Sequence, residues 1–292
     1  MSPKNDTRPI IDVHLHSADM TWITGSDTSW WPHKIARPTS DTALMNETIR
    51  TLRANNVVRA IASGFGMPTT DRYRSAAPEL IVPAEMFGGS GNVDSLRAHY
   101  KQGRIRALGE VLWQYGGISA ADPAVDKFWA LAEELDAPVG IHMGPGPPGE
   151  QLHGSYRSVL SDALQLEPVL IKHPKLRVWV MHAGWPMVDR MIALLYAFPE
   201  VYVDISVIDW YIPRAEFHSY LKRLVEAGFG HRIMYGSDQM LWPGAIPASI
   251  SAINSAAFLS DTEKRNILCD NAARFFRFGE AVCRLGARSN TR

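Results

Sequence analysis

The sequence predicts a single (β/α)8 barrel, or TIM barrel, spanning residues 1–292. Short apolar runs alternate with amphipathic stretches of helical length, which is typical of a parallel sheet that is buried on both faces and connected by helices. A length of 292 residues suits one barrel of eight such units. Polar residues follow many of the apolar runs, which favours a barrel whose strand ends form one site.

Eight apolar runs are the predicted strands. They span residues 9–15, 57–62, 80–84, 105–111, 138–142, 176–182, 201–205 and 232–236. Helices are expected over residues 43–55, 124–135, 158–171, 187–198 and 214–227. The alternation is weakest between the second and third units, and it is sharpest from the fifth strand onward.

Charge and hydropathy limit the classes of partner. Lys plus Arg and Asp plus Glu both number 30, so the formal net charge is zero and gives no long-range attraction to nucleic acid. No apolar stretch is long enough for a membrane span, and residues 1–16 lack the apolar core of a signal peptide. We therefore expect a cytoplasmic protein that acts on a small molecule.

The two cysteines, Cys269 and Cys283, lie close to the C-terminus. Two residues do not make a disulfide framework, and their spacing is not that of a zinc–thiolate site. The sequence therefore predicts two free thiols.

The strongest functional signal is a set of polar residues at the carboxyl ends of predicted strands. These residues are His14, His16, Glu110, His142, His182 and Asp238. Because the strand ends of a barrel converge on one mouth, residues distant in sequence are expected to meet there.

The segment Asp12–His16 has a geometry of its own. Residues i and i+2 of a strand share a face, so His14 and His16 should lie side by side, roughly 6–7 Å apart at Cα. Two neutral imidazoles at that spacing can bind one ion together, and His142 and Asp238 could supply its remaining ligands. The ligands carry nitrogen and oxygen only, which suits Zn²⁺ and also Mn²⁺ or Fe²⁺.

At these residues the chain resembles the amidohydrolase superfamily, and most closely its amidohydrolase-2 branch. The resemblance covers nearly the whole chain. It rests on Asp-Val-His-Leu-His at 12–16, Gly-Glu-Val at 109–111, Gly-Ile-His at 140–142, Met-His-Ala-Gly at 181–184, Tyr-Gly-Ser-Asp at 235–238 and Asn-Ala-Ala-Arg-Phe-Phe at 271–276.

That resemblance implies a metal-dependent barrel enzyme, commonly a homodimer. His14, His16, His142 and Asp238 match metal-ligand positions, and His182 matches either a second-metal ligand or a catalytic group. Glu110 stands where some relatives have a bridging ligand, and an ordinary strand-end carboxylate is the alternative.

The resulting hypothesis is hydrolysis of an ester, lactone or amide by a metal-activated water. Asp238 would accept a proton from that water and pass it to the leaving group, and His182 would polarise the scissile carbonyl. Asp12 would either fix the imidazoles from behind or face solvent. Non-oxidative decarboxylation of an aromatic acid is the rival reaction, and its expected mark is a cationic side chain for the carboxylate.

Aromatic residues follow the first and seventh strands. Trp22, Trp30 and Trp31 would form either a lid over a substrate ring or a packing surface between subunits. Trp210 and Tyr211 are further candidates for the pocket wall.

Overall fold

Eight parallel strands form a barrel in the computed structural model, which describes residues 8–21, 35–64, 66–88, 92–152 and 154–284. The strands are β1 Ile10–His16, β2 Val57–Ser63, β3 Ile81–Phe87, β4 Ala107–Val111, β5 Pro138–His142, β6 Arg177–Met181, β7 Tyr202–Asp204 and β8 Ile233–Met234. Each strand pairs with the next along the chain. The predicted barrel is therefore confirmed.

The first and last strands close the ring through main-chain hydrogen bonds. Val13 N donates to Tyr235 O at 3.0 Å, and Leu15 forms a parallel bridge with Gln239. Because β8 itself is only two residues long, the segment after it completes this seam.

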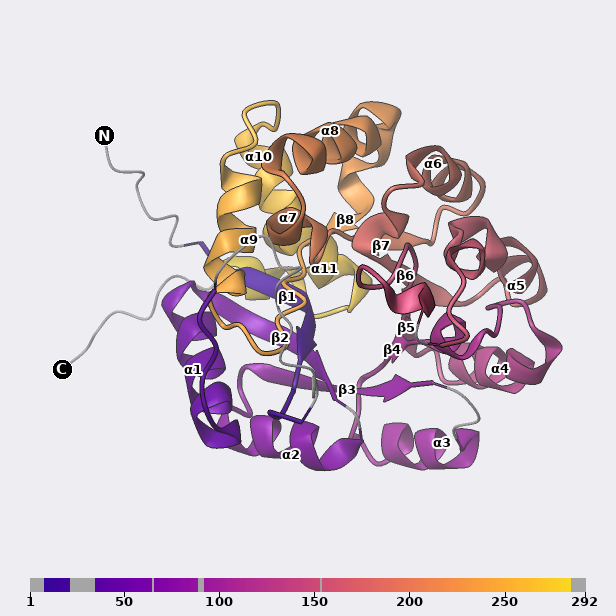
Figure 1. Ribbon diagram of the computed structural model, residues 1–292, viewed down its shortest axis with the longest axis horizontal. Helices are drawn as coiled ribbons and strands as arrows, with labels where there is room; N and C mark the ends of the chain where they lie inside the picture. The colour runs from indigo at the N-terminus through magenta and orange to yellow at the C-terminus, as the bar shows by residue number, and fades with distance from the viewer. Residues whose placement is uncertain (1–7, 22–34, 65, 89–91, 153, 285–292) are drawn as a thin grey trace.

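Helices surround the ring of strands (Figure 1). They are α1 Asp41–Ala54, α2 Met67–Ala76, α3 Val93–Lys101, α4 Asp126–Glu134, α5 Glu167–Lys172, α6 Val188–Ala197, α7 Ile208–Tyr211, α8 Arg214–Leu224, α9 Ala245–Asn254, α10 Asp261–Arg265 and α11 Asn271–Phe275. Local signals set several of their ends. Ser40 caps α1 by accepting from Ala43 N, and Ser260 forms a capping box with Glu263 at α10.

The apolar side chains form two main layers. The larger lies between strands and helices and includes Leu108, Val139 and Leu221. The other gathers buried side chains from six strands, which meet inside the barrel, together with residues of the C-terminal segment. Phe275 of α11 packs edge-on against Trp179 of β6, so this segment closes the amino-terminal end of the barrel.

The helix predicted over 158–171 is wrong in its first half. Residues Ser158–Ser161 and Ala163–Leu166 form separate 3₁₀ turns, and only Glu167–Lys172 is α-helical. Asp162 is extended and its carboxylate accepts from Leu164 N, which ends one turn and caps the next. Short-range side-chain bonding therefore overrides the helical pattern of this stretch.

The expectation of two free thiols is also wrong. Cys269 and Cys283 form a disulfide, with their Cα atoms 5.9 Å apart. The chain turns back after α11, so 14 residues of separation bring the two sulfurs together. The bond ties the turn Glu280–Arg284 to the π-helical turn Asn266–Asp270 beside β8.

Among the described residues, no helix combines the length and apolar character needed to cross a membrane.

Gly140 of β5 is required by the packing inside the barrel. A Cβ atom at this position would lie 2.3 Å from the Trp179 ring and 2.5 Å from the terminal carbon of Met181. We expect Gly140→Ala to lower the free energy of unfolding by about 1–3 kcal/mol, because a buried indole cannot withdraw. Urea denaturation measures this, with Gly154→Ala as the control, since a Cβ there meets nothing within 4 Å. Equal stability of the two variants would contradict this packing.

Candidate metal centre

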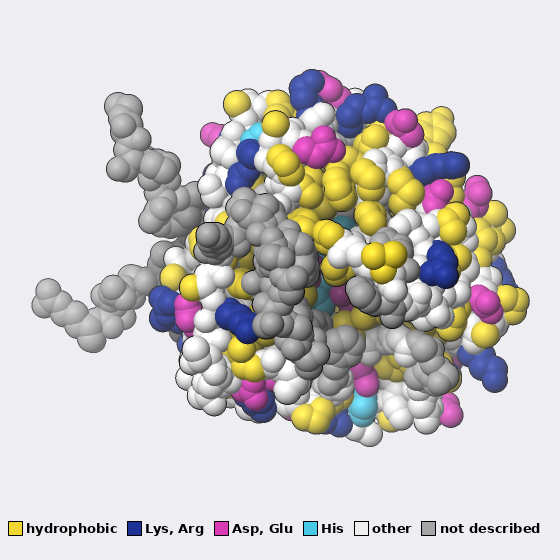
Figure 2. Space-filling view, viewed as in Figure 1, with side chains coloured by type: hydrophobic (Ala, Val, Ile, Leu, Met, Phe, Trp, Pro, Cys, Tyr) yellow, Lys and Arg dark blue, Asp and Glu magenta, His cyan; other side chains and the backbone are white. Residues whose placement is uncertain are grey.

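The six predicted site residues lie together at the carboxyl ends of the strands. His14 and His16 lie on β1, Glu110 on β4 and His142 at the end of β5. His182 begins the 3₁₀ turn after β6, and Asp238 lies in the segment after β8. Each is at most 7% exposed. Figure 2 shows histidine and acidic atoms at the bottom of a hollow in the middle of this face.

One group of donors is built around the β1 histidines. The Nε2 atoms of His14 and His16 lie 3.3 Å apart. Asp238 Oδ1 lies 3.4 Å from the first and 2.8 Å from the second, and Glu110 Oε2 lies 3.7 and 3.4 Å from them. Two strands and the segment after β8, all far apart in sequence, thus aim four donor atoms at one point.

A second group uses the other oxygen of the same glutamate. Glu110 Oε1 lies 2.7 Å from His142 Nδ1 and 3.6 Å from His182 Nε2, and the two ring nitrogens are 3.1 Å apart. The sequence predicts that His142 binds the same ion as His14 and His16. In the structure His142 lies outside that first donor group and faces His182 beside the Glu110 carboxylate. Glu110 joins the two groups, as a bridging ligand would.

The donor set fits a divalent ion. Nitrogen and oxygen ligands bound at about 2.0–2.2 Å lie about 3–3.5 Å from one another, close to the spacings found here. His142 Nε2 is buried and has no hydrogen-bond partner among the described residues, so this ligand-type atom is unsatisfied in a residue of the centre. The side chains that could hold the ion are His14, His16, Glu110, His142, His182 and Asp238.

Glu110 stays ionised in this buried place. Burial alone would raise its pKa, but hydrogen bonds with His14, His142 and His182 outweigh it and hold the pKa well below the usual value. The centre thus keeps a fixed negative charge, which attracts a cation.

The protonation of the histidines also depends on the buried carboxylates around them. Burial lowers the pKa of His14, but Asp238 and Asp204 outweigh it and raise the pKa well above 6.5. Burial and the neighbouring His182 lower the pKa of His142. Without a metal the centre therefore retains a proton at His14, and a metal ion would compete with that proton.

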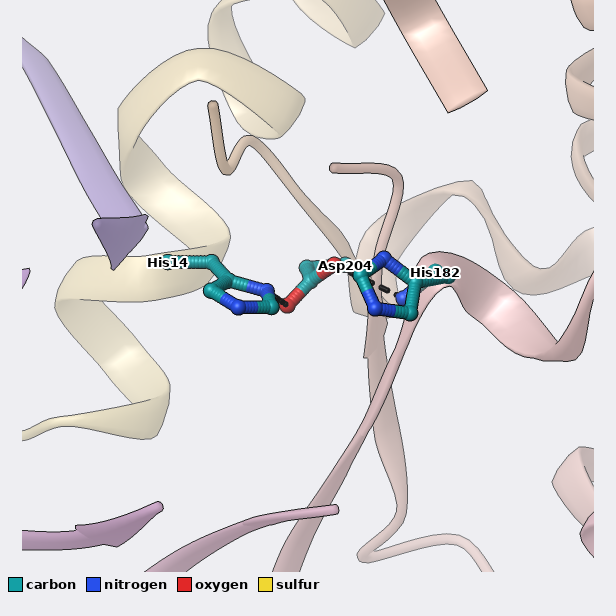
Figure 3. A group of neighbouring side chains, drawn as sticks. All are labelled: His14, His182 and Asp204. Atoms are coloured by element: carbon teal, nitrogen blue, oxygen red, sulfur yellow. Dashed lines mark hydrogen bonds and ion pairs between the residues drawn. The ribbon is translucent and has the colours of Figure 1, made fainter. Parts of the chain in front are cut away.

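Asp204 lies between His14 and His182 (Figure 3), and the Ser206 hydroxyl is within hydrogen-bond distance of all three side chains. Ser206 Oγ donates to Asp204 Oδ1 at 2.6 Å, so it accepts from His14 Nδ1 at 2.8 Å. His182 Nδ1 lies 3.1 Å from the main-chain oxygen of Ser206, which can only accept. Both rings thus carry a proton on Nδ1 and present Nε2 toward Glu110.

The site residues stand on strained backbone. His182, Ala183, Val207 and Asp238 all have φ between 48° and 57°. Such left-handed conformations cost about 1–3 kcal/mol each for residues other than glycine, and more for a β-branched residue such as Val207. All four lie just after β6, β7 or β8, where they turn polar groups into the mouth.

Asp12 positions main chain rather than imidazole rings, and it does not face solvent. It is fully buried, and its Oδ1 accepts from His14 N at 3.1 Å and from Ser237 N at 2.9 Å. Burial raises its pKa to about 6. Trp210 also acts on this seam, because its indole donates to Ser237 O at 2.7 Å.

Sequence reasoning missed Asp204, Ser206 and Tyr115. Asp204 ends a predicted strand, so the rule that found the other site residues would have found it too. Tyr115 packs edge-on against the His142 ring, and burial raises its pKa well above the usual value. It lies on a 3₁₀ turn after β4, and no motif marks it. Trp22, Trp30 and Trp31 lie outside the described residues.

Fold and site together define a barrel enzyme built around a metal centre. The amidohydrolase family model matches residues 11–278, so this chain belongs to the amidohydrolase family. The family is metal-dependent. No curated relative matches the chain.

Solved structures from several bacteria share the fold. An uncharacterised TIM-barrel protein from Bordetella bronchiseptica has a TM-score of 0.71 at 16% identity, over 92% of this chain and 98% of its own. A probable 2-pyrone-4,6-dicarboxylic acid hydrolase from Acinetobacter baumannii has a TM-score of 0.66 at 18% identity, and the match covers 92% of this chain and 99% of its own. A 5-carboxyvanillate decarboxylase from Novosphingobium aromaticivorans, complexed with manganese, has a TM-score of 0.63 at 13% identity, and the match covers 92% of this chain and 96% of its own.

Ser206→Ala removes the acceptor that fixes the His14 ring. We expect affinity for a divalent ion to fall about 10- to 100-fold, as is typical when a partner of a ligand histidine is lost. Competition with a chromogenic chelator measures this, with Ser119→Ala as the control, since Ser119 bonds Gln165 instead. Equal affinity in both variants would show that Ser206 does not orient the ring.

Proposed function

We propose that this protein is a metal-dependent hydrolase that cleaves an ester, lactone or amide bond in a small ring-bearing molecule. The observation that carries the proposal is the first donor group. There the Asp238 carboxylate lies within 3.4 Å of both β1 imidazoles, so it can bind an ion and still reach a water beside it. A bound divalent ion would supply Lewis acidity and lower the pKa of that water.

The side chains take separate roles in this proposal. His14, His16 and Asp238 hold the ion, with Glu110 beside them and His142 on the far side of Glu110. Asp238 accepts the proton of the attacking water and returns it to the leaving group. The Nδ1 proton of His182 is held by the Ser206 carbonyl. The protonated ring would donate from Nε2–H to the scissile carbonyl oxygen, whereas the neutral ring would offer the Nε2 lone pair to a second ion.

Non-oxidative decarboxylation is the second candidate. It is supported by the structural likeness to two kinds of decarboxylase, those of 5-carboxyvanillate and of 2,6-dihydroxybenzoate. Both candidates need the same centre, so only the reaction separates them. Zinc is our first choice of metal, and the manganese of one neighbour supports manganese as the alternative. A cytoplasmic homodimer remains our expectation for the assembly.

Metal content tests the centre directly. We expect elemental mass spectrometry to find at least one equivalent of zinc or manganese in the purified protein, and to find it lost from His14→Ala. His218→Ala is the matched control, because that histidine bonds the Ala252 carbonyl away from the site. A second equivalent that disappears in His182→Ala would assign the second donor group. Absence of metal after reconstitution would overturn the proposal.

Asp238→Asn tests the proton transfer. We expect kcat to fall by about 100-fold or more at saturating metal, because an amide cannot accept the proton, while the free energy of unfolding changes little. The assay uses a panel of aryl esters and lactones, with carbon dioxide release from aromatic acids measured in parallel. Asp189→Asn, at an exposed acid of α6, is the control. Full hydrolytic activity in Asp238→Asn would exclude it as the base, and carbon dioxide release alone would favour the decarboxylase.

A further inference from the structure

A second cavity lies at the opposite end of the barrel from the metal centre. Its volume is about 420 Å³, and the residues that begin β3, β5 and β6 line it. Arg106 also lines it and precedes β4, four residues before Glu110, or roughly 13 Å along the strand. The cavity is therefore separate from the site described above, and the size suits a small organic molecule.

Positive charge is in excess around this cavity. Within the described residues, Arg74 donates to the main-chain oxygens of Gly103 and Arg104 alone, and neither oxygen offsets its charge. Arg177 forms an ion pair with Asp136, and the neighbouring Arg277 pairs with the same carboxylate, so one negative charge faces two guanidinium groups.

Arg106 completes the charged wall. It is exposed and has no ion pair with any residue in the part of the chain that the structure describes. Its guanidinium, beside that of Arg74, is therefore open to an external anion. A planar fork of donors suits a carboxylate, sulfonate or phosphate bound through two oxygens.

Aromatic rings form the other wall. Phe276 and Phe278 lie nearly parallel, with an angle of 12° between the rings and 5.6 Å between their centres, and both line the cavity with Tyr100. Each is half-buried, so part of its surface remains open to a ligand. A flat ring gains the most from such a wall.

We propose that this cavity binds a flat aromatic compound that carries two anionic groups. Arg106 and Arg74 would hold one anionic group, the Arg177 side would attract the other, and the phenylalanine rings would cover the ligand's flat body. The site does not depend on the metal centre, so it can be tested whether or not the proposed hydrolase activity is found.

Isothermal titration with naphthalene-1,5-disulfonate tests the site on the full chain. We expect saturable binding that weakens about 10- to 100-fold in Arg106→Ala, because one charge-assisted pair is lost. Phe278→Ala should weaken it as well. Arg50→Ala is the control, since Arg50 is an exposed arginine of α1 far along the chain. Inorganic sulfate, which lacks the ring, and 2-naphthol, which lacks the charge, should each bind more weakly than the disulfonate.

Several outcomes would overturn the proposal. Binding that Arg106→Ala leaves unchanged would place the ligand elsewhere, the barrel mouth included. Sulfate that binds as tightly as the disulfonate would show that the aromatic wall adds nothing. No saturable binding by the wild-type chain would mean that the arginines serve only the packing of the barrel end. Arg106→Gln repeats the test with a polar side chain, and circular dichroism confirms that each variant folds.

Discussion

Burying a carboxylate in a protein is costly unless partners stabilise its charge, and the centre of this barrel is organised around one such group. Glu110 is 5% exposed, yet contacts with His14, His142 and His182 keep it ionised. Its two oxygens divide the histidines into two donor groups. The arrangement is stable only while a proton or a metal ion balances the negative charge, so the binding of a cation and the integrity of the site are linked.

The cost of this arrangement is visible in the chain around it. Ser206 and Asp204 fix ring orientations from behind, and Asp12 ties the main chain of β1 to the segment after β8. Left-handed backbone at His182, Val207 and Asp238 aims polar groups inward. Such features stabilise a geometry rather than the fold, and they cluster where a barrel usually carries its chemistry.

The sequence predicts the barrel and most of the centre, because both depend on short-range patterns. Apolar runs give the strands, and a polar residue at a strand end is visible without coordinates. The patterns do not show how Glu110 divides its oxygens, since that depends on the closure of the ring. They also missed the disulfide, because a turn after α11 brings Cys269 and Cys283 together. Ser206 escaped notice because its role lies in contacts with residues 24 and 192 positions away.

A barrel of this kind separates catalysis from recognition. The donor groups lie on the strands or just after them, and solved structures of a probable hydrolase and of a decarboxylase share this fold. Tyr115 illustrates the point, because it comes from a turn after β4 and packs against the His142 ring. The arginines at the amino-terminal end come from strand starts and from the end of a helix. Arg106 immediately precedes β4, which carries Glu110, and Arg177 begins β6, which leads into His182, so the same two strands run from this cavity to the metal centre.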